Sequence, residues 1–316
     1  MPTDELRALR TSVRANYIEN GQDERILAHM RYIVDNANDI REGAGSDRRC
    51  LFVIGPPGTG KTTSLNRNRK LIPEFAPRRR GDVLIEPFLS VASPKKGAPL
   101  DLLVSMLTAM RLPAEGNERE LTRLFKEQVK HQERLVVHID EGQHPIRSNT
   151  PKAIMGVQDF LKELIRGTEW PLHIILSGVK ELDNLRTGDG QMERRSHVMQ
   201  FHRMSFPDDI DWLRLILKDV ATEQCGLKLA ESITSDEFLG RLCRAMNGGW
   251  GSVIEMVQEA SFVALANGRT ELGVNHFAYR YEMISACEPG ENIFTSSRWN
   301  QLKSKHSLMK MREEEE

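Results

Sequence analysis

Cysteine is scarce in this sequence and widely spaced. The 316 residues include only four cysteines, and no two of them have the short spacing of a metal site: Cys50, Cys225, Cys243 and Cys287. Scattered cysteines suit a reducing compartment, where they serve as small buried hydrophobic residues. We therefore expect no cysteine metal centre.

Long apolar runs are also absent. No stretch approaches the roughly 20 residues that a membrane-spanning helix needs. Residues 1–14 mix both charge signs and lack the apolar core of a signal peptide. The sequence therefore predicts a cytoplasmic protein with no membrane partner.

A strong excess of one charge is missing as well. The formal net charge is -1, so the chain as a whole is not a polycation. Any nucleic-acid binding has to come from a local basic patch, or from an assembly that repeats a weak one. With 39% hydrophobic and 28% charged residues, the composition is that of an ordinary soluble protein, and its length suggests about two domains.

Short apolar runs alternate with helical periodicity in the first two thirds of the chain. Four runs predict buried strands: residues 50–54, 82–91, 134–140 and 171–177. This alternation predicts an α/β fold, a parallel sheet flanked by helices. From residue 208 onward only helical patterns occur, which predicts a small all-helical domain.

These patterns divide the chain into four expected parts. They are an N-terminal helical segment (residues 1–46), a nucleotide-binding α/β domain (47–206), a helical lid domain (207–290) and a polar, acidic tail (291–316).

A glycine-rich loop follows the first predicted strand and precedes a predicted helix. Gly55-Pro56-Pro57-Gly58-Thr59-Gly60-Lys61-Thr62 fits the pattern G-x-x-x-x-G-K-S/T, and Thr63 follows it. Glycines let backbone N–H groups approach phosphates, and the helix N-terminus adds partial positive charge. Lys61 would contact the β and γ phosphates, and Thr62 would ligate magnesium. The loop therefore predicts ATP and Mg²⁺ as cofactors; a chance glycine turn is the alternative.

Two carboxylates stand where the third predicted strand ends. Asp140 and Glu141 follow an apolar segment, and ligands bind at the carboxyl ends of strands in such sheets. We expect Asp140 to hold the magnesium shell and Glu141 to polarise the attacking water. A solvated turn that caps the next helix is the alternative. His138 and His144 are expected to be packing residues, or to support residues that contact a ligand, without a chemical role of their own.

The order of these motifs resembles the AAA+ ATPases over about residues 47–287. Within that superfamily the sequence is most similar to the TniB proteins, ATP-binding transposition regulators related to TnsC and MuB. The segments that carry the resemblance are 51–63 (LFVIGPPGTGKTT), 136–144 (VVHIDEGQH), 174–182 (IILSGVKEL), 192–195 (MERR) and 248–260 (GGWGSVIEMVQEA).

The resemblance implies three further features of the site. Ser177 matches the polar sensor that touches the γ-phosphate or the attacking water. Arg194 and Arg195 match the arginine finger that one subunit offers to its neighbour, a role suited to a guanidinium; a solvated basic pair is the alternative. Gly251 stands where AAA+ lids commonly carry an arginine, which implies slow, switch-like hydrolysis.

The resemblance also implies DNA as a partner. Lys95 and Lys96 lie in a loop that faces the central channel of related rings and helical filaments, where it follows the backbone of duplex DNA. One or two phosphate contacts per subunit, repeated around a homo-oligomer, would give a strong and sequence-independent grip. Other basic clusters, such as residues 67–70 and 78–80, are more typical of solvated faces.

Three functions remain open at this stage. The first is an ATP-dependent DNA-binding regulator of transposition, which selects target DNA and recruits or activates a transposase, with a target-selection protein as a possible further partner. The second is an AAA+ loader of replication or repair proteins. The third is an ATP-gated scaffold that does not hydrolyse ATP, against which Glu141 argues.

Overall fold

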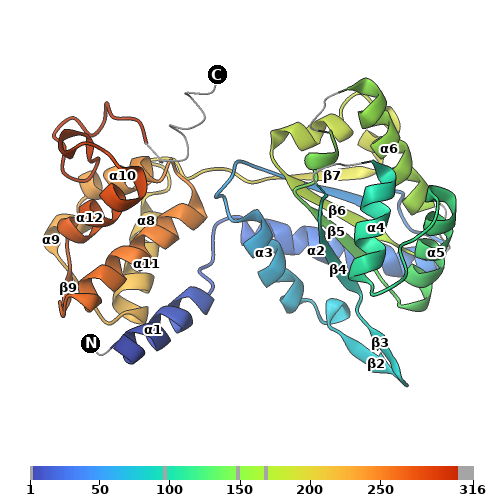
Figure 1. The fold of residues 1–316 in the computed structure, drawn as a ribbon, viewed down its shortest axis with the longest axis horizontal. Helices are drawn as coiled ribbons and strands as arrows, with labels where there is room; N and C mark the ends of the chain where they lie inside the picture. Colours follow the sequence, from blue (N-terminus) through green and yellow to red (C-terminus); the bar gives the residue numbers. More distant parts are fainter. Residues whose placement is uncertain (1–2, 95–97, 147–149, 167–169, 305–316) are drawn as a thin grey trace. The chain divides into compact units, whose positions relative to one another are not determined.

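The structure is a computed structural model that describes residues 3–94, 98–146, 150–166 and 170–304. Contacts divide the chain into two compact units (Figure 1). The sheet unit comprises residues 21–57 and 61–201, and the helical unit comprises residues 1–20, 58–60 and 202–316. Each unit has its own apolar core.

Five parallel strands form the sheet; the sequence predicts a parallel sheet, but with four strands. In spatial order they are β4 (Phe88–Ala92), β5 (Val136–Asp140), β6 (His173–Gly178), β1 (Cys50–Ile54) and β7 (Ser196–Gln200). The central strands are buried along their whole length, because helices cover both faces of the sheet.

Alternate residues of β1 contribute to different cores. The helices of this unit are α2 (Asp23–Arg41), α3 (Lys61–Asn68), α4 (Pro99–Ala109), α5 (Glu118–His131), α6 (Pro151–Arg166) and α7 (Gly190–Arg194). Leu51 and Val53 of β1 lie in the core that contains α2 and α3, whereas Phe52 and Ile54 lie in the core that contains α4, α5 and α6. Short 3-10 turns are η1 (Arg69–Leu71), η2 (Pro73–Phe75), η3 (His144–Ile146) and η4 (Lys180–Leu185).

The prediction of one continuous strand over residues 82–91 is wrong. Only its second half joins the sheet, as β4, while β3 (Val83–Ile85) pairs antiparallel with β2 (Arg78–Arg80) in a separate hairpin. Pro87 separates the two halves, because it has no N–H to donate to a ladder. Its carbonyl instead accepts from the backbone N–H groups of Leu135 and Val136, at 2.8 and 2.9 Å. Strand β7 is a further element that the sequence did not predict.

The helical unit is built around α11 (Trp250–Ala266). Its other helices are α1 (Thr3–Ala15), α8 (Ile210–Leu217), which continues as the π-helix η5 (Lys218–Gln224), α9 (Glu231–Thr234), α10 (Asp236–Ala245) and α12 (Val274–Ser285), with a 3-10 turn η6 (Pro289–Glu291). Two-residue strands β8 (Lys228–Leu229) and β9 (Glu271–Leu272) pair in parallel. The prediction of helices alone from residue 208 onward missed this pair.

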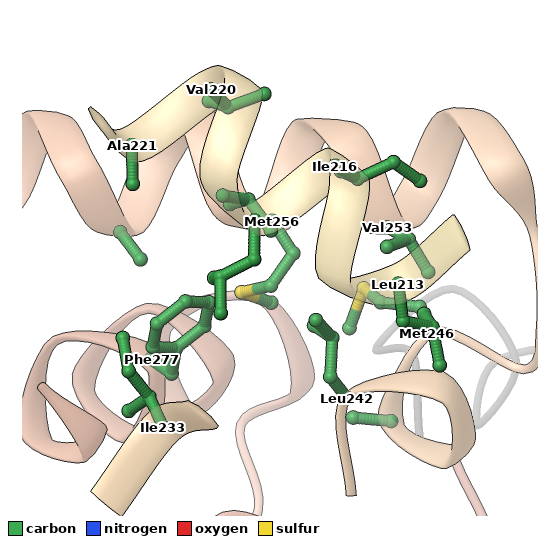
Figure 2. Close-up of a cluster of buried hydrophobic side chains, with 14 of the residues drawn as sticks. Leu213, Ile216, Val220, Ala221, Ile233, Leu242, Met246, Val253, Met256 and Phe277 are labelled. Atoms are coloured by element: carbon green, nitrogen blue, oxygen red, sulfur yellow. The ribbon is translucent and has the colours of Figure 1, made fainter. Parts of the chain in front are cut away.

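Side chains from several helices fill the core of the helical unit (Figure 2). Leu213 and Ile216 of α8, Val253 and Met256 of α11, and Phe277 of α12 are all 2% exposed or less. Each buried side chain of this size contributes roughly 1.5–3 kcal/mol through burial. This unit is therefore held together by apolar packing.

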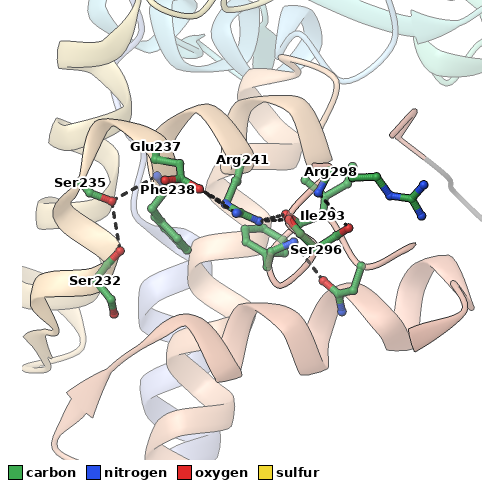
Figure 3. Close-up of polar contacts among 10 residues, drawn as sticks. Ser232, Ser235, Glu237, Phe238, Arg241, Ile293, Ser296 and Arg298 are labelled. Atoms are coloured by element: carbon green, nitrogen blue, oxygen red, sulfur yellow. Dashed lines mark hydrogen bonds and ion pairs between the residues drawn. The ribbon is translucent and has the colours of Figure 1, made fainter. Parts of the chain in front are cut away.

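Arg241 of α10 contacts the segment that follows η6 (Figure 3). The Arg241 guanidinium donates to the carbonyls of Ile293 and Ser296, at 2.7 and 2.8 Å, and pairs with Glu237 at 2.7 Å. It also lies 5.4 Å from the ring centre of Trp299. A guanidinium can make several hydrogen bonds in its plane while contacting an aromatic ring, a combination that lysine cannot match.

No helix in the described ranges is both long enough and apolar enough to cross a membrane.

Candidate functional site

The polar residues predicted to act together follow three neighbouring strands. β6 lies between β1 and β5, with Val53 opposite Ser177 and Ile139 opposite Leu176. Because all three strands are parallel, their carboxyl ends share one edge of the sheet. The glycine loop, Asp140 and Ser177 therefore meet at that edge.

The glycine loop leaves β1 through a position that only glycine fits. The Gly55 N–H donates to the Gly178 carbonyl at 3.0 Å, and a Cβ on Gly55 would lie 2.6 Å from the Phe201 carbonyl oxygen. Further along the loop, Gly60 has φ +86°, a conformation that side chains strongly disfavour. The backbone thus turns tightly before α3 begins at Lys61.

Lys61 lies under the loop. Its side chain is 9% exposed, and its Nζ donates to the carbonyls of Gly55 and Pro56 at 2.8 and 3.0 Å. Burial lowers the pKa of Lys61, while the nearby Glu141 and Asp140 carboxylates raise it and so favour the charged form. A cation is therefore held at the start of α3, next to two carboxylates.

Asp140 collects three donors. It accepts from Thr62 Oγ1 at 2.9 Å, from Ser177 Oγ at 2.5 Å and from the Glu141 N–H at 3.0 Å. Burial raises the pKa of Asp140, but the hydrogen bonds from Ser177, Thr62 and the Glu141 N–H, together with the nearby His138, outweigh burial, so its pKa lies below the ordinary value. Asp140 is therefore an ionised carboxylate.

The neighbouring oxygens of Thr62 and Asp140 fit a magnesium ion. Magnesium prefers hard oxygen ligands, and it is usually held by one or two carboxylates together with water and substrate phosphates. Among the described residues, no group of three or more His, Cys, Asp or Glu side chains could hold a metal by itself. A hydroxyl next to one ionised carboxylate suits magnesium better than a metal that needs a full protein cage.

Glu141 presents its carboxylate beside Asp140. Its side chain is 54% exposed, and its backbone has φ +55°, a left-handed conformation that is uncommon outside glycine and concentrates at functional sites. The Gln143 amide donates to this carboxylate, and its oxygen accepts from the Val179 N–H at 3.4 Å. Gln143 has no sequence signal beyond its position, and the sequence interpretation did not include it.

His138 was expected to have no chemical role, yet it lies directly behind Ser177. The ring is fully buried, with Nδ1 2.9 Å from Ser90 Oγ and Nε2 2.8 Å from Ser177 Oγ. A polar residue inside the apolar run of β5 is the one sequence signal that points to it.

Arg194 and Arg195 lie at the opposite edge of the sheet. Arg194 ends α7, and the Arg195 carbonyl accepts from the N–H of Cys50, the first residue of β1. The five residues of β1 separate this point from the glycine loop by about 16 Å. Arg194 is exposed, with its Nε bonded only to its own helix, at the Gly190 carbonyl, in the described contacts. Lys95 and Lys96 lie outside the described residues.

Comparisons with known proteins agree with this geometry. Residues 41–185 match the family model described as an AAA domain. No curated protein sequence matches the chain. Several solved structures share the fold at low sequence identity.

Three of these structures illustrate the likeness. Cdc6p from Pyrobaculum aerophilum is 14% identical with a TM-score of 0.57, over 89% of this chain and 71% of that one. The ORC2 protein of Aeropyrum pernix is 16% identical with a TM-score of 0.56, over 88% and 75%. Drosophila ORC, solved bound to DNA, is 13% identical with a TM-score of 0.51, over 92% and 70%. The chain therefore has the AAA+ P-loop fold, followed by a helical region.

Proposed function

We propose that this protein is an ATP-dependent regulator of DNA transposition. In this proposal it assembles on duplex DNA when ATP is bound, selects the target and recruits or activates a transposase. The observation that carries the nucleotide part is the convergence of Thr62 and Ser177 on Asp140 beside the glycine loop. The transposition part is supported by the resemblance of the motifs to the TniB proteins.

Each group at the sheet edge has a defined part in ATP hydrolysis. The N–H groups of residues 55–63 and the Lys61 ammonium would hold the phosphates, while Thr62 and Asp140 would hold magnesium, which neutralises charge on the β and γ oxygens when bound. Glu141 is the acceptor for the proton of the attacking water, because its carboxylate is exposed at the site and Asp140 is already engaged by three donors.

The arginine finger comes from a second copy of the chain in this proposal. Arg194 and Arg195 follow the opposite edge of the sheet, so neither reaches the glycine loop of its own subunit. Arg194 is the better candidate, since it is exposed, whereas Arg195 is partly buried. The active form is therefore a homo-oligomer, either a ring or a helical filament.

Slow hydrolysis follows from two features. Gly251, the second residue of α11, contributes no cation where AAA+ lids commonly supply an arginine. The Glu141 carboxylate is also held by Gln143, which competes with an attacking water for it. ATP then serves as a timer for assembly.

DNA binding is proposed for the loop that contains Lys95 and Lys96. It is supported by the family resemblance, and by the likeness of the fold to Drosophila ORC, which was solved bound to DNA. The contacts would go to backbone phosphates, which makes binding independent of sequence and sensitive to salt.

A loader of replication or repair proteins is the second candidate. The observation that favours it is the fold likeness to Cdc6p and ORC2 over most of the chain. It shares the nucleotide site and differs in the partner that is recruited.

Electron microscopy of the purified protein with duplex DNA tests the proposal. Rings or filaments are expected with ATP and a non-hydrolysable analogue, and their loss with ADP. Monomers in every nucleotide state would contradict the proposal. Adding a transposase and measuring strand transfer then separates the two candidates, because a loader would leave strand transfer unchanged.

A further inference from the structure

A line of hydrogen bonds crosses three strands to reach Asp140. It begins at the exposed Ser90 on β4, passes through the buried His138 on β5 and reaches Ser177 at the end of β6. Ser177 then contacts Asp140. The successive distances are 2.9, 2.8 and 2.5 Å.

The direction of every bond in this line follows from its last member. Asp140 is ionised and can only accept, so the Ser177 hydroxyl donates to it. Ser177 has one proton, so its oxygen must accept from His138, and Nε2 of that ring therefore carries the hydrogen. In a neutral ring Nδ1 is then unprotonated, and it accepts from the Ser90 hydroxyl.

The surroundings of His138 favour this neutral ring. The ring is fully buried, and burial away from water disfavours its charged form. The ring also lies 6.2 Å from the ring of Phe88, an apolar neighbour. A neutral imidazole has one donor and one acceptor, and both are used here.

We infer that His138 is a positioning residue for Ser177, acting through a fixed Nε2–H that occupies the acceptor side of the serine oxygen. This inference rests on the proposed ATP hydrolysis. Ser177 is left with only its proton to give, so it can donate to a carboxylate or a phosphate oxygen. It cannot take a proton from water, and Glu141 is the group that does so.

A second buried histidine provides an internal reference. His173 begins β6, and its Nε2 lies 2.9 Å from the Asn36 amide nitrogen, which can only donate. Its Nδ1 lies 3.0 Å from the Pro171 carbonyl, which can only accept. His173 is therefore the Nδ1–H tautomer, whereas His138 is the Nε2–H tautomer.

Nuclear magnetic resonance of the ¹⁵N-labelled full chain tests the tautomers without any assay of activity. At pH 7 we expect His138 as the neutral Nε2–H tautomer and His173 as the neutral Nδ1–H tautomer. The variant His138→Gln should lack the Nε2–H signals of His138 and keep the signals of His173. An Nδ1–H or doubly protonated ring at position 138 would overturn the inference.

Kinetics test whether the bond positions Ser177. His138→Leu is expected to lower kcat for ATP about tenfold to a hundredfold, as supporting residues commonly do, with little change in KM. Ser177→Ala should lower kcat similarly, and the double variant should be no worse than Ser177→Ala alone. His138→Gln, whose amide nitrogen can still donate to Ser177, should restore most of the loss.

Specific outcomes would contradict this role. If the losses for His138→Leu and Ser177→Ala multiply in the double variant, His138 does not act through Ser177. A failure of His138→Gln to recover activity, although it folds and binds ATP as the wild type does, counts equally against it. If the wild type hydrolyses no ATP, the proposed function fails, while the tautomer measurement still decides the geometry.

Discussion

The fully buried serines of the two units have their hydrogen-bond partners in different places. In the sheet unit, His138 and Ser177 bond to partners on neighbouring strands and lead to Asp140. In the helical unit, Ser261 and Ser285 are fully buried, but each donates to the carbonyl four residues earlier in its own helix, at 2.7 Å.

The location of the hydrogen-bond partner distinguishes a buried side chain that fixes a neighbouring element from one that does not. A serine that bonds back to its own helix is satisfied wherever that helix goes, and it fixes no other element. A buried group whose partner lies on another strand is satisfied only when the register is right. Buried polar groups with distant partners are therefore better pointers to function than buried polar groups as such.

The largest expected effect concerns Arg194. We predict that Arg194→Ala lowers the ATPase rate by about a thousandfold or more, because an arginine finger neutralises charge in the transition state. Arg195→Ala is the matched control and should retain most of the rate. Steady-state hydrolysis in the presence of DNA measures both. If both variants lose the same fraction of the ATPase rate, the greater exposure of Arg194 does not identify it as the arginine finger.

Glu141→Gln should lower hydrolysis about a hundredfold to ten-thousandfold, because the amide cannot accept the proton of water. ATP binding should persist, and assemblies on DNA should last longer. Glu255→Gln, an exposed residue of α11 in the helical unit, is the control and should have no effect. Unchanged turnover in Glu141→Gln would end the assignment of Glu141 as the base.

Acid should destabilise the sheet unit in particular. Burial lowers the pKa of His173 from 6.5 to about 4, so the unfolded chain binds the proton more readily than the folded one. This contribution to stability is complete above pH 6.5 and is lost as the pH falls toward 4, by at most about 3 kcal/mol.

Urea unfolding of the wild type and of His173→Leu between pH 7 and 4 measures this effect. The pH dependence should be weaker in the variant, and hydrogen exchange should show the sheet unit opening first. The buried histidines of the described chain, His138 and His173, both belong to that unit. Parallel stability curves for the two proteins would refute the prediction.

A smaller effect is expected at the start of α10 (Figure 3). Ser235 caps this helix by accepting from the Phe238 N–H at 3.3 Å. Ser235→Ala should lower the free energy of unfolding by about 1 kcal/mol, while Ser235→Asp should preserve it. Thermal melting of both variants tests the cap, and ATP hydrolysis should be unaffected in each.

The smallest effect is expected at Ser285. Its bond to its own helix makes Ser285→Ala nearly neutral, within about 0.5 kcal/mol, because alanine is a better helix former. Chemical denaturation measures the change. If the variant loses 2 kcal/mol or more, a hydrogen bond within one helix contributes substantially to stability, and the contrast between the two units fails.

The sequence predicted the fold class well, because its signals are local. The four apolar runs overlap β1, β4, β5 and β6, and the helical patterns after residue 208 match the helical region. β7 escaped prediction because the edge strand Ser196–Gln200 is only partly buried and has no apolar run. Hairpin β2–β3 escaped because Arg78 to Arg80 are all exposed; Arg78 and Arg80 instead pair with Glu133.

The candidate site was predictable only where it follows a contiguous motif. The loop around Lys61 and the Asp140-Glu141 pair can be read from consecutive residues. His138 and Gln143 could not be placed, because their partners depend on strand register and on a left-handed turn at Glu141. Strand register cannot be read from the sequence alone, so residues that support the motifs from neighbouring strands are found only in the structure.

The double pairing of β1 has a mechanical consequence. The same five residues of this strand pair with β6 on one side and with β7 on the other. The strand cannot slide without breaking both ladders, so we expect it to stay fixed during the proposed nucleotide cycle. Displacements between nucleotide states are then expected in the glycine loop and the segments beyond it, relative to a stationary strand.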